Sequence, residues 1–549
     1  MPSQETPARV CALWARVLEL PRVGLDDNFF QLGGRSLTAV RVVRAVLAEF
    51  GVSLSVQQVF EAPTPRAFAE RVTAGAEAGG YAGPTPRSQG EAAPLTWQQE
   101  WQYRLEQAVS GSNIYSSFVR FELAGSVDRA AFDGAWLDVV ERHAALRTRY
   151  RVSNGVIRQT VQPDASYELE EHDLGGLDEA ARLEQHMKLH AAFTGRGHDL
   201  ARDCGLRVQL VTLAPDRAEV MVSVHHINFD GWSRDILLAD FVAGYRARCA
   251  LGQPPARPRS QYTDFARWQR ERIDAVAGEH LSFWREVVGT GAPRLHGDTP
   301  SARPTYLSAR HELSLPPESA RGLIRLAQEE GTTPFAACLA MFGTVLTDRL
   351  GVSRLPVATI TANRTWAATH EVIGMFLTIL PVAFDAAGQP TVRELLRRVG
   401  ASVVRTMGHQ EYPLEHAYLT QEPAESRRLV GGLRYGIALH PAFRPEREVT
   451  PDLRLAQLPP RLAGDDGGQE DEVDPSTFDV TLELRESPAG LVGHLTHQLD
   501  AVPQRTAAEL VAHLTRLVTL AHREPDARVA ELAARAGAGQ PSGPGAGEG

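Results

Sequence analysis

One stretch of the 549-residue sequence has the composition of a linker and divides the chain into two unequal parts. Residues 74–94, AGAEAGGYAGPTPRSQGEAAP, are rich in Gly, Ala, Pro and Ser, which favour a flexible or extended backbone over a packed core. A chain of this length is also expected to form about two to four domains. We therefore expect a small domain over residues 1–74, a flexible linker over 75–93 and a large domain over 94–530.

Two further segments interrupt the periodic sequence of the large domain, and a third follows it. The loop-forming residues 289–304, GTGAPRLHGDTPSARP, suggest two lobes over about 94–285 and 286–530. The acidic run 463–475, AGDDGGQEDEVDP, is typical of a solvated surface loop. Residues 534–549 bury too little apolar surface to offset their ordering entropy, so they predict a disordered tail.

Composition and charge exclude several classes of protein. Basic residues number 57 and acidic residues 67, so the net charge of −10 gives no general attraction to nucleic acid or to an anionic membrane. The sequence has no run of about 18 apolar residues and no N-terminal signal pattern. Neither a disulfide framework nor a zinc knuckle is indicated by the spacing of Cys11, Cys204, Cys249 and Cys338. We expect a cytoplasmic protein with no nucleic-acid and no membrane partner.

The small domain contains a serine where a helix is expected to begin. Apolar residues recur with helical spacing over 37–50, and Gly33 and Gly34 come shortly before them. Glycine adopts backbone conformations that other residues resist, so a tight turn here can project the Ser36 hydroxyl. Taken alone, the pattern also fits a serine that only caps the helix.

A second candidate site follows two predicted strands. Residues 206–213 and 218–224 alternate as strands joined by a turn, and the second leads into the heptapeptide HHINFDG at 225–231. A helix is expected from about Ser233. Adjacent residues of a strand point to opposite faces, so His225 and His226 are not expected to bind one metal ion, and no metal site is predicted. One imidazole can instead act as a base or positioning group, or both can be structural.

Residues 27–37, DNFFQLGGRSL, resemble the phosphopantetheine attachment motif of the carrier proteins of nonribosomal peptide synthetases, and VFEAPT at 59–64 resembles the family's downstream helix. The resemblance implies a four-helix-bundle carrier domain. It also implies 4'-phosphopantetheine attached covalently to Ser36 by a phosphopantetheinyl transferase. Arg35 departs from the family pattern, in which His or Asp more often precedes the serine.

The HHINFDG segment resembles the HHxxxDG signature of condensation domains and related CoA-dependent acyltransferases. Further segments resemble condensation-domain motifs in the same order, namely LTWQQ at 95–99, RHAALRT at 142–148, YTDFARW at 262–268, IGMF at 373–376 and HQEYPLE at 409–415. The resemblance covers the chain except the linker and the tail. It implies an α/β protein overall, with the carrier followed by a two-lobed α+β domain like chloramphenicol acetyltransferase.

The resemblance also implies roles for individual residues. His226 is expected to be catalytic and His225 structural. Asp230 is expected to form a scaffold ion pair with Arg364, and Gly231 to keep a tunnel between the lobes open. Two departures leave the substrate subtype and stereochemistry open: Thr378 stands where the family usually has Asn, and Glu100-Trp101 replace the usual residues after the opening glutamine.

The activity implied is condensation, in which an acyl or peptidyl thioester carried on Ser36 reacts with an amine to give an amide. No adenylation or thioesterase motif is visible, so we expect an adenylation domain or enzyme to load the carrier in trans. The expected acceptor is a downstream carrier protein with an aminoacyl thioester, or a free amine. Ester formation, epimerisation and a noncatalytic docking module that recruits a tailoring enzyme are the alternatives. Heterocyclisation is disfavoured because those relatives have an Asp-based motif, and a free-standing CoA acyltransferase would not need the carrier.

Overall fold

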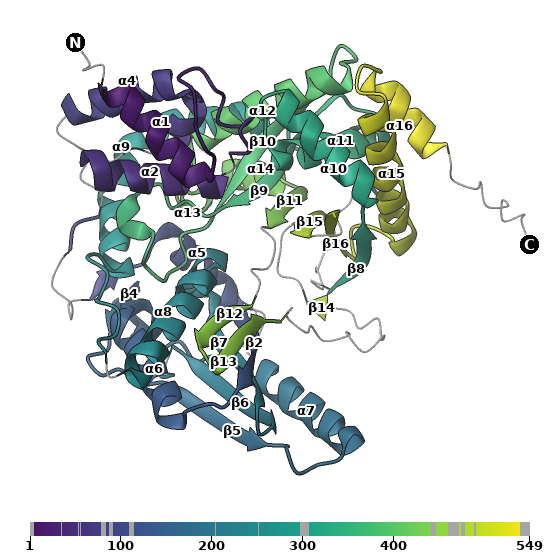
Figure 1. The fold of residues 1–549 in the computed structure, drawn as a ribbon. Coiled ribbons are helices and arrows are strands. Elements are labelled where there is room, and N and C mark those ends of the chain that lie inside the picture. The colour runs from purple at the N-terminus through teal and green to yellow at the C-terminus, as the bar shows by residue number, and fades with distance from the viewer. Residues whose placement is uncertain are drawn as a thin grey trace, which may run out of the picture.

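The structure is a computed structural model, and it describes residues 5–34, 36–52, 54, 56–77, 84–86, 92–108, 115–203, 205–250, 252–296, 307–440, 446–458, 472–473, 478–487 and 490–538. The described residues form a small helical domain and a large domain whose two lobes are arranged as a V (Figure 1). Most of the predicted acidic loop lies outside the described residues, as do parts of the predicted linker and tail.

The small domain packs its helices around aromatic side chains. Its helices are α1 (Glu5–Leu18), α2 (Ser36–Phe50), α3 (Val56–Glu61) and α4 (Pro65–Glu77). The ring of Trp14 lies 5.2 Å from that of Phe29 and 5.7 Å from that of Phe68 between centroids, and all three are fully buried. Helix α2 covers the segment that the periodicity predicts. The last helix continues three residues into the predicted linker.

The first lobe is built on a mixed sheet with the strand order β12-β13-β2-β7-β6-β5. These strands are β2 (Ser116–Gly125), β5 (Glu168–Asp173), β6 (Arg207–Ala214), β7 (Arg217–His225), β12 (Arg447–Thr450) and β13 (Leu453–Gln457). Strands β6 and β7 form the antiparallel hairpin that the alternating sequence predicts, with Val208 opposite Val222. On its other side β7 pairs with β2, and Ser116 of β2 lies opposite His225 of β7.

Helices cover both faces of this sheet because its strands bear apolar residues on both. Val208 and Val220 pack with α6 (Arg129–Arg142) and α8 (Gly231–Cys249), whereas Val211 and Leu213 pack toward α7 (Glu179–Thr194). A smaller sheet has the order β1-β4-β3. The remaining elements of this lobe are β1 (Ala93–Pro94), β3 (Thr148–Ser153), β4 (Val156–Val161), α5 (Trp97–Ala108), α9 (Tyr262–Val288), η1 (Ala144–Arg147) and η2 (His226–Asn228).

The second lobe has a sheet in the order β10-β9-β11-β15-β16-β8-β14. Its strands are β8 (Leu307–Ser314), β9 (Arg354–Thr361), β10 (Thr378–Asp385), β11 (Tyr435–His440), β14 (Glu472–Val473), β15 (Val480–Ser487) and β16 (Gly490–Gln498). Its helices are α10 (Pro317–Glu329), α11 (Pro334–Leu350), α12 (Val392–Met407), α13 (Leu414–Thr420), α14 (Pro423–Gly431), α15 (Gln504–Arg523) and α16 (Val529–Gly537), together with η3 (Ala367–Thr369). The largest apolar core lies between this sheet and a layer that includes α10, α11 and α15.

The path of the chain crosses between the lobes. Strands β12 and β13 come from the second half of the sequence, yet β13 pairs with β2 and completes the first-lobe sheet. Val372, Ile373 and Phe376 likewise pack in the first-lobe core. The predicted division near residue 285 therefore does not separate the lobes completely, because some residues that follow it in the sequence belong to the first lobe. The predicted tail begins inside α16, which ends at Gly537.

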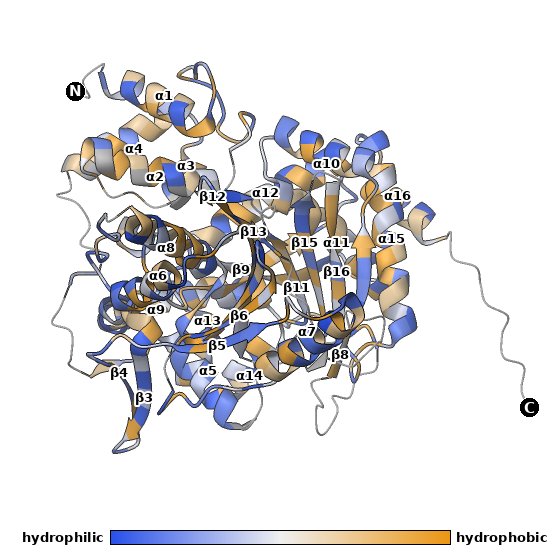
Figure 2. Ribbon diagram, turned by 60° about the horizontal axis from the view of Figure 1, so that its bottom comes forward, coloured by the Kyte–Doolittle hydropathy of each residue, from blue (hydrophilic) through white to orange (hydrophobic). Residues whose placement is uncertain are grey.

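Hydropathy follows this arrangement. In Figure 2 the helices bear both apolar (orange) and hydrophilic (blue) residues, as expected for helices with one face in a core and one in water. Within the described part of the chain, no helix is both long and apolar enough to span a bilayer.

Candidate active site

The predicted histidine pair lies at the end of β7, where the single turn η2 leads into α8. His225 is 3% exposed. Its Nδ1 accepts the backbone N–H of Ile227 at 3.1 Å, so the ring proton is on Nε2, which donates to the Glu106 carboxylate at 3.1 to 3.2 Å. Both nitrogens of His225 are therefore engaged in holding the turn.

His226 has the opposite arrangement of hydrogen bonds. Its Nδ1 donates to the Phe229 carbonyl oxygen at 2.5 Å, because a carbonyl oxygen can only accept. Nε2 then keeps its lone pair, and among the described residues no group hydrogen-bonds to it. Burial lowers the pKa of His226, against the opposing effects of the Phe229 bond and the charge of Asp230. A partly exposed, neutral imidazole with a free basic nitrogen results.

Asp230 and Arg364 form a buried ion pair beside this turn. Each is 3% exposed, and Arg364 Nη2 donates to both carboxylate oxygens of Asp230 at 2.9 and 3.1 Å. Asp230 also caps α8 by accepting the backbone N–H and the hydroxyl of Ser233 at 2.8 and 2.7 Å. Asp230 is therefore occupied by structural contacts, as the scaffold role predicts.

The same pair ties the histidine turn to the IGMF segment. Asp230 Oδ2 accepts the backbone N–H of Phe376 at 3.1 Å, and Arg364 Nη1 donates to the carbonyl oxygens of Thr369 and Val372 at 2.6 Å. The Gly374 backbone N–H donates to the Ser233 hydroxyl oxygen at 3.1 Å. Residues 225–233 and 364–376 thus form one unit built from both halves of the chain.

Two glycines in this unit have different surroundings. A Cβ on Gly374 would overlap the Tyr262 ring, so no larger residue fits there. A Cβ on Gly231, the first residue of α8, would meet no described atom within 4 Å. Open space beside Gly231 agrees with the predicted role of this residue in keeping a tunnel open, which stays a prediction.

Sequence reasoning gave no role to several residues that hold the site. Gln99 Nε2 donates to the Tyr150 hydroxyl at 2.8 Å and to the Ile227 carbonyl oxygen at 3.1 Å. The Tyr150 hydroxyl in turn donates to Asn228 Oδ1 at 2.5 Å. Gln99 belongs to the opening motif, and Tyr150 follows two residues after the RHAALRT motif, so position near a motif was the available signal. Glu106 lies in none of these motifs, so no sequence signal indicated its role.

Ser36 is the first residue of α2, at the end of the predicted glycine turn. Gly33 has φ of 86°, and a Cβ on Gly34 would overlap the Phe29 ring and lie 2.5 Å from the Phe29 carbonyl oxygen. Both positions therefore require glycine. A phosphodiester attached to the first residue of a 15-residue helix would meet the partial positive charge of the helix N-terminus, so this site fits a phosphopantetheine group. Arg35 lies outside the described residues.

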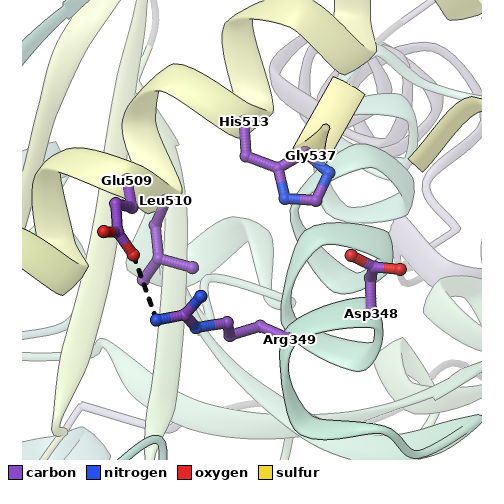
Figure 3. Close-up of a pocket in the computed structure, with 6 residues that line it drawn as sticks. All are labelled: Asp348, Arg349, Glu509, Leu510, His513 and Gly537. Carbon is purple, nitrogen blue, oxygen red and sulfur yellow. Dashed lines mark hydrogen bonds and ion pairs between the residues drawn. The ribbon is translucent and has the colours of Figure 1, made fainter. Parts of the chain in front are cut away.

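A separate cavity of about 140 Å³ lies between α11, α15 and α16 (Figure 3). Arg349 and Glu509 on its wall form an ion pair with a 3.0 Å separation. The cavity contains none of the predicted site residues. Within the described residues, no group of three or more His, Cys, Asp or Glu side chains is arranged to hold a metal ion.

Comparison with protein families gives a match for nearly the whole chain. The model of the condensation domain matches residues 89–536, and that of the phosphopantetheine attachment site matches residues 8–72. The chain belongs to the condensation-domain family. The match at 8–72 confirms the carrier domain and its covalent phosphopantetheine, although the assignment of individual site residues in both domains stays a prediction.

The condensation domain and its carrier are similar to parts of longer peptide synthetases. Phosphinothricin tripeptide synthetase PhsB of Streptomyces viridochromogenes is 32% identical over 95% of this chain, and a dimodular nonribosomal peptide synthase of Bacillus subtilis is 30% identical over 95%. The chain spans 44% of the first protein and 22% of the second.

Solved structures confirm the fold of the condensation domain. The X-domain of teicoplanin biosynthesis, in its complex with OxyB, matches with a TM-score of 0.66 at 22% identity, over 82% of this chain and 98% of that one. The condensation domain of the monacolin K polyketide synthase MokA matches with a TM-score of 0.65 at 18% identity, over 81% of this chain and all of that one. The expected two-lobed fold after a helical carrier is thereby confirmed.

Proposed function

We propose that this chain forms amide bonds in nonribosomal peptide biosynthesis, with His226 as the catalytic residue. When attached to Ser36, phosphopantetheine supplies the thiol that holds the acyl group as a thioester. Attack by an amine forms a C–N bond to the acyl carbon and breaks its C–S bond, and the proton lost by the amine is balanced by the proton gained by the thiol. The observation that carries this proposal is that Nε2 of His226 has no hydrogen-bond partner among the described residues, beside the Asp230–Arg364 ion pair that holds the loop.

The hydrogen bonds of His226 fit a role in handling the amine. The Phe229 carbonyl fixes the ring with its proton on Nδ1, so Nε2 is the nitrogen that can accept a hydrogen from the attacking group. Burial keeps the pKa of the ring low, so Nε2 is unprotonated at neutral pH. A positioned base contributes about 10²- to 10⁴-fold, and holding both reactants together contributes further.

The carrier contacts support delivery of the thioester within the same chain. Helix α3 packs against α12 of the second lobe, and Val404 of α12 packs against the carrier core. Helix α2, which begins at Ser36, approaches η3. The residue after η3, His370, accepts a hydrogen bond at 3.2 Å from Trp232 Nε1, next to Gly231. Helix α2 is thus near the loop that leads to the histidine site.

The remaining partners follow from the chemistry. We propose that a phosphopantetheinyl transferase modifies Ser36 and that an adenylation enzyme supplies the acyl or aminoacyl group in trans. The amine comes from a free acceptor or from an aminoacyl group on a downstream carrier protein. The similarity to peptide synthetases of which this chain spans only a part supports such partners.

Intact-mass measurement of the loaded protein tests the proposal. The chain is loaded from an acyl-CoA by a phosphopantetheinyl transferase and mixed with a panel of amines and aminoacyl carriers. The wild type is expected to lose its acyl group and yield an amide, whereas His226→Ala keeps the acyl group and Ser36→Ala never gains one. Discharge at equal rates by wild type and His226→Ala would contradict the role of His226.

The likeness to the X-domain makes a binding module the second candidate, because that solved structure is a complex with another protein, OxyB. A binding module would load Ser36 and keep the acyl group with every acceptor. Epimerisation would invert an aminoacyl group on the carrier without discharging it, and an alcohol acceptor would give an ester of different mass. The same measurement, with analysis of stereochemistry, therefore separates these outcomes.

A further inference from the structure

Helix α5 lies between the histidine turn and the second lobe. On one side of α5, Gln99 holds the turn through the Ile227 carbonyl oxygen. On another side, the Trp97 ring meets His416 and the Trp101 ring meets Tyr418, at centroid distances of 4.5 and 3.9 Å. His416 and Tyr418 belong to α13 of the second lobe. Helix α5 therefore lies where the two lobes meet.

A polar stripe on α5 lies between these two sides. Gln98, Gln102 and Glu106 are spaced four residues apart, so they share one face of the helix. At about 100° per residue this face lies between the Gln99 direction and the direction of the two tryptophans. Glu106, at its C-terminal end, accepts a hydrogen bond from His225. The stripe thus runs toward the residue that precedes the candidate catalytic histidine.

The two glutamines are buried and have unused amide donors. Gln98 is 2% exposed and Gln102 is 5% exposed. The Trp97 backbone N–H donates to Gln269 Oε1, and Gln269 Nε2 then donates to Gln98 Oε1, both at 3.0 Å. This chain of bonds fixes the Gln98 amide with its N–H group as a donor. Among the described residues, neither Gln98 Nε2 nor Gln102 Nε2 has an acceptor.

An unused acceptor lies nearby on α13. Glu415 is 7% exposed, and its Oε2 has no partner among the described residues. It directly precedes His416, whose ring contacts Trp97, and its charge acts on Tyr262, whose hydroxyl lies 3.2 Å from Thr96 Oγ1. Glu415 therefore lies near the N-terminal end of α5, where Gln98 is located.

Buried polar groups without partners are rare in folded proteins, because each costs free energy unless a partner is bound. Amide donors fit carbonyl oxygens, and a carboxyl group fits an N–H donor. Carbonyl oxygens and N–H groups alternate along a peptidyl or N-acylaminoacyl chain, whereas a plain alkyl chain has neither. The unused donors of α5 and the unused acceptor of α13, on elements next to the histidine turn, therefore match a substrate with amide groups.

We propose that Gln98 and Gln102 hydrogen-bond to an amide oxygen of the acyl donor, so that this domain selects peptidyl or N-acylaminoacyl groups over alkyl acyl groups. This inference rests on the proposed function, because it assumes that the donor reaches His226. A site that binds a polar substrate group discriminates strongly against an analogue without it, because the buried groups are then left unpaired. The two glutamines are specificity-determining residues for the condensation reaction.

Binding of two stable analogues tests the inference without turnover. The probes are amides of N-acetylglycine and of pentanoic acid with aminopantetheine, in which an amine replaces the pantetheine thiol. The two acyl groups have equal chain lengths but differ in the internal amide. Calorimetry on full-length Ser36→Ala protein is expected to show about tenfold tighter binding of the N-acetylglycyl probe. Gln98→Leu and Gln102→Leu each lose most of this preference at nearly unchanged volume. Gln107→Leu, which changes an exposed glutamine of the same helix, keeps it.

Several results would overturn the inference. One is equal binding of both probes by the Ser36→Ala protein with both glutamines intact, and another is a preference that survives both substitutions. Equal weakening of both probes by Gln98→Leu and Gln102→Leu would indicate a structural role instead. The proposed function fails separately: retained preference in this assay, with no amide formed by loaded wild-type protein, would count against the reaction and leave the glutamine site standing.

Discussion

The two histidines of the HHINFDG segment are proposed to have different roles because their hydrogen bonds differ. His225 accepts at Nδ1 from a backbone N–H, whereas His226 donates from Nδ1 to a carbonyl oxygen, so the two rings are in opposite tautomers. Only His226 keeps a basic nitrogen free. The alternation of side chains along a strand predicts that the two rings diverge, and the motif resemblance predicts which one is catalytic.

Removing the Asp230 carboxylate is expected to destabilise the protein as well as to slow turnover. Asp230→Ala leaves Arg364 buried without its counterion, which costs about 3 to 5 kcal/mol in free energy of unfolding. Urea denaturation measures this loss. Glu184→Ala, which breaks the exposed ion pair with Lys188, serves as the control and is expected to change little. An Asp230→Ala protein with wild-type stability and slow turnover would contradict the scaffold role.

The buried carboxyl of Glu415 is expected to make stability depend on pH. Burial raises its pKa from 4.5 to about 7, so between these values the folded state binds more protons than the unfolded state. Stability from this group is therefore complete below about pH 4.5, is lost as pH rises through about 7, and amounts to at most about 3 kcal/mol. Glu415→Gln, which cannot ionise, should lack this slope when unfolding is measured from pH 5 to 8. Parallel curves for the two proteins would show that Glu415 is not responsible.

Residue types and spacings predict which side chains matter more readily than how they are held. His226, Asp230 and Arg364 could be named from motifs, and the structure brings all three together around one loop. Glu106 could not be named, because its contact with His225 joins positions far apart in the chain and no motif contains it. Gln98 and Gln102 were also unforeseen, since unsatisfied donors are visible only once burial is known.

At the scale of elements, the strongest local patterns predicted the structure best. The hairpin of β6 and β7 and the whole of α2 follow directly from alternating and helical periodicity. Strands β12 and β13 were not predicted from the sequence. They are four and five residues long, and β13 gains its place by pairing with a strand more than 300 residues earlier. Such pairing depends on non-local contacts that periodicity does not encode.

The close approach between the IGMF segment and α9 is expected to tolerate no added methyl group. Gly374→Ala would force the Tyr262 ring to move, because the new Cβ would overlap it. We expect a loss of about 1 to 3 kcal/mol, as for other overpacked cores. Gly278→Ala is the matched control: Gly278 is exposed within α9 with open space at its Cβ, so alanine should raise stability by up to about 1 kcal/mol. Thermal unfolding compares the two, and similar effects of both substitutions would argue against the tight contact.

At the scale of the whole molecule, the carrier lies against the second lobe through α3 and α12 (Figure 1). Introducing a charge into this contact is expected to release the carrier. Val404→Glu should slow discharge of the chain's own carrier several-fold by lowering its effective concentration at the site. It should also increase the radius of gyration in small-angle scattering. Ala508→Glu, at an exposed position of α15, is the control. Unchanged scattering and discharge in Val404→Glu would show that this contact does not guide the carrier.

The strands that cross from the second half of the chain into the first-lobe sheet also bear on how condensation domains can be recombined. Residues 447–457 belong to the second lobe by sequence but to the first by hydrogen bonding. Consider a hybrid synthetase that joins the first lobe of one parent to the second lobe of another. Its first-lobe sheet would pair with edge strands from the other parent. Transferring residues 447–457 together with the first lobe of the same parent should restore a matched sheet. The unit to exchange is therefore discontinuous in the gene.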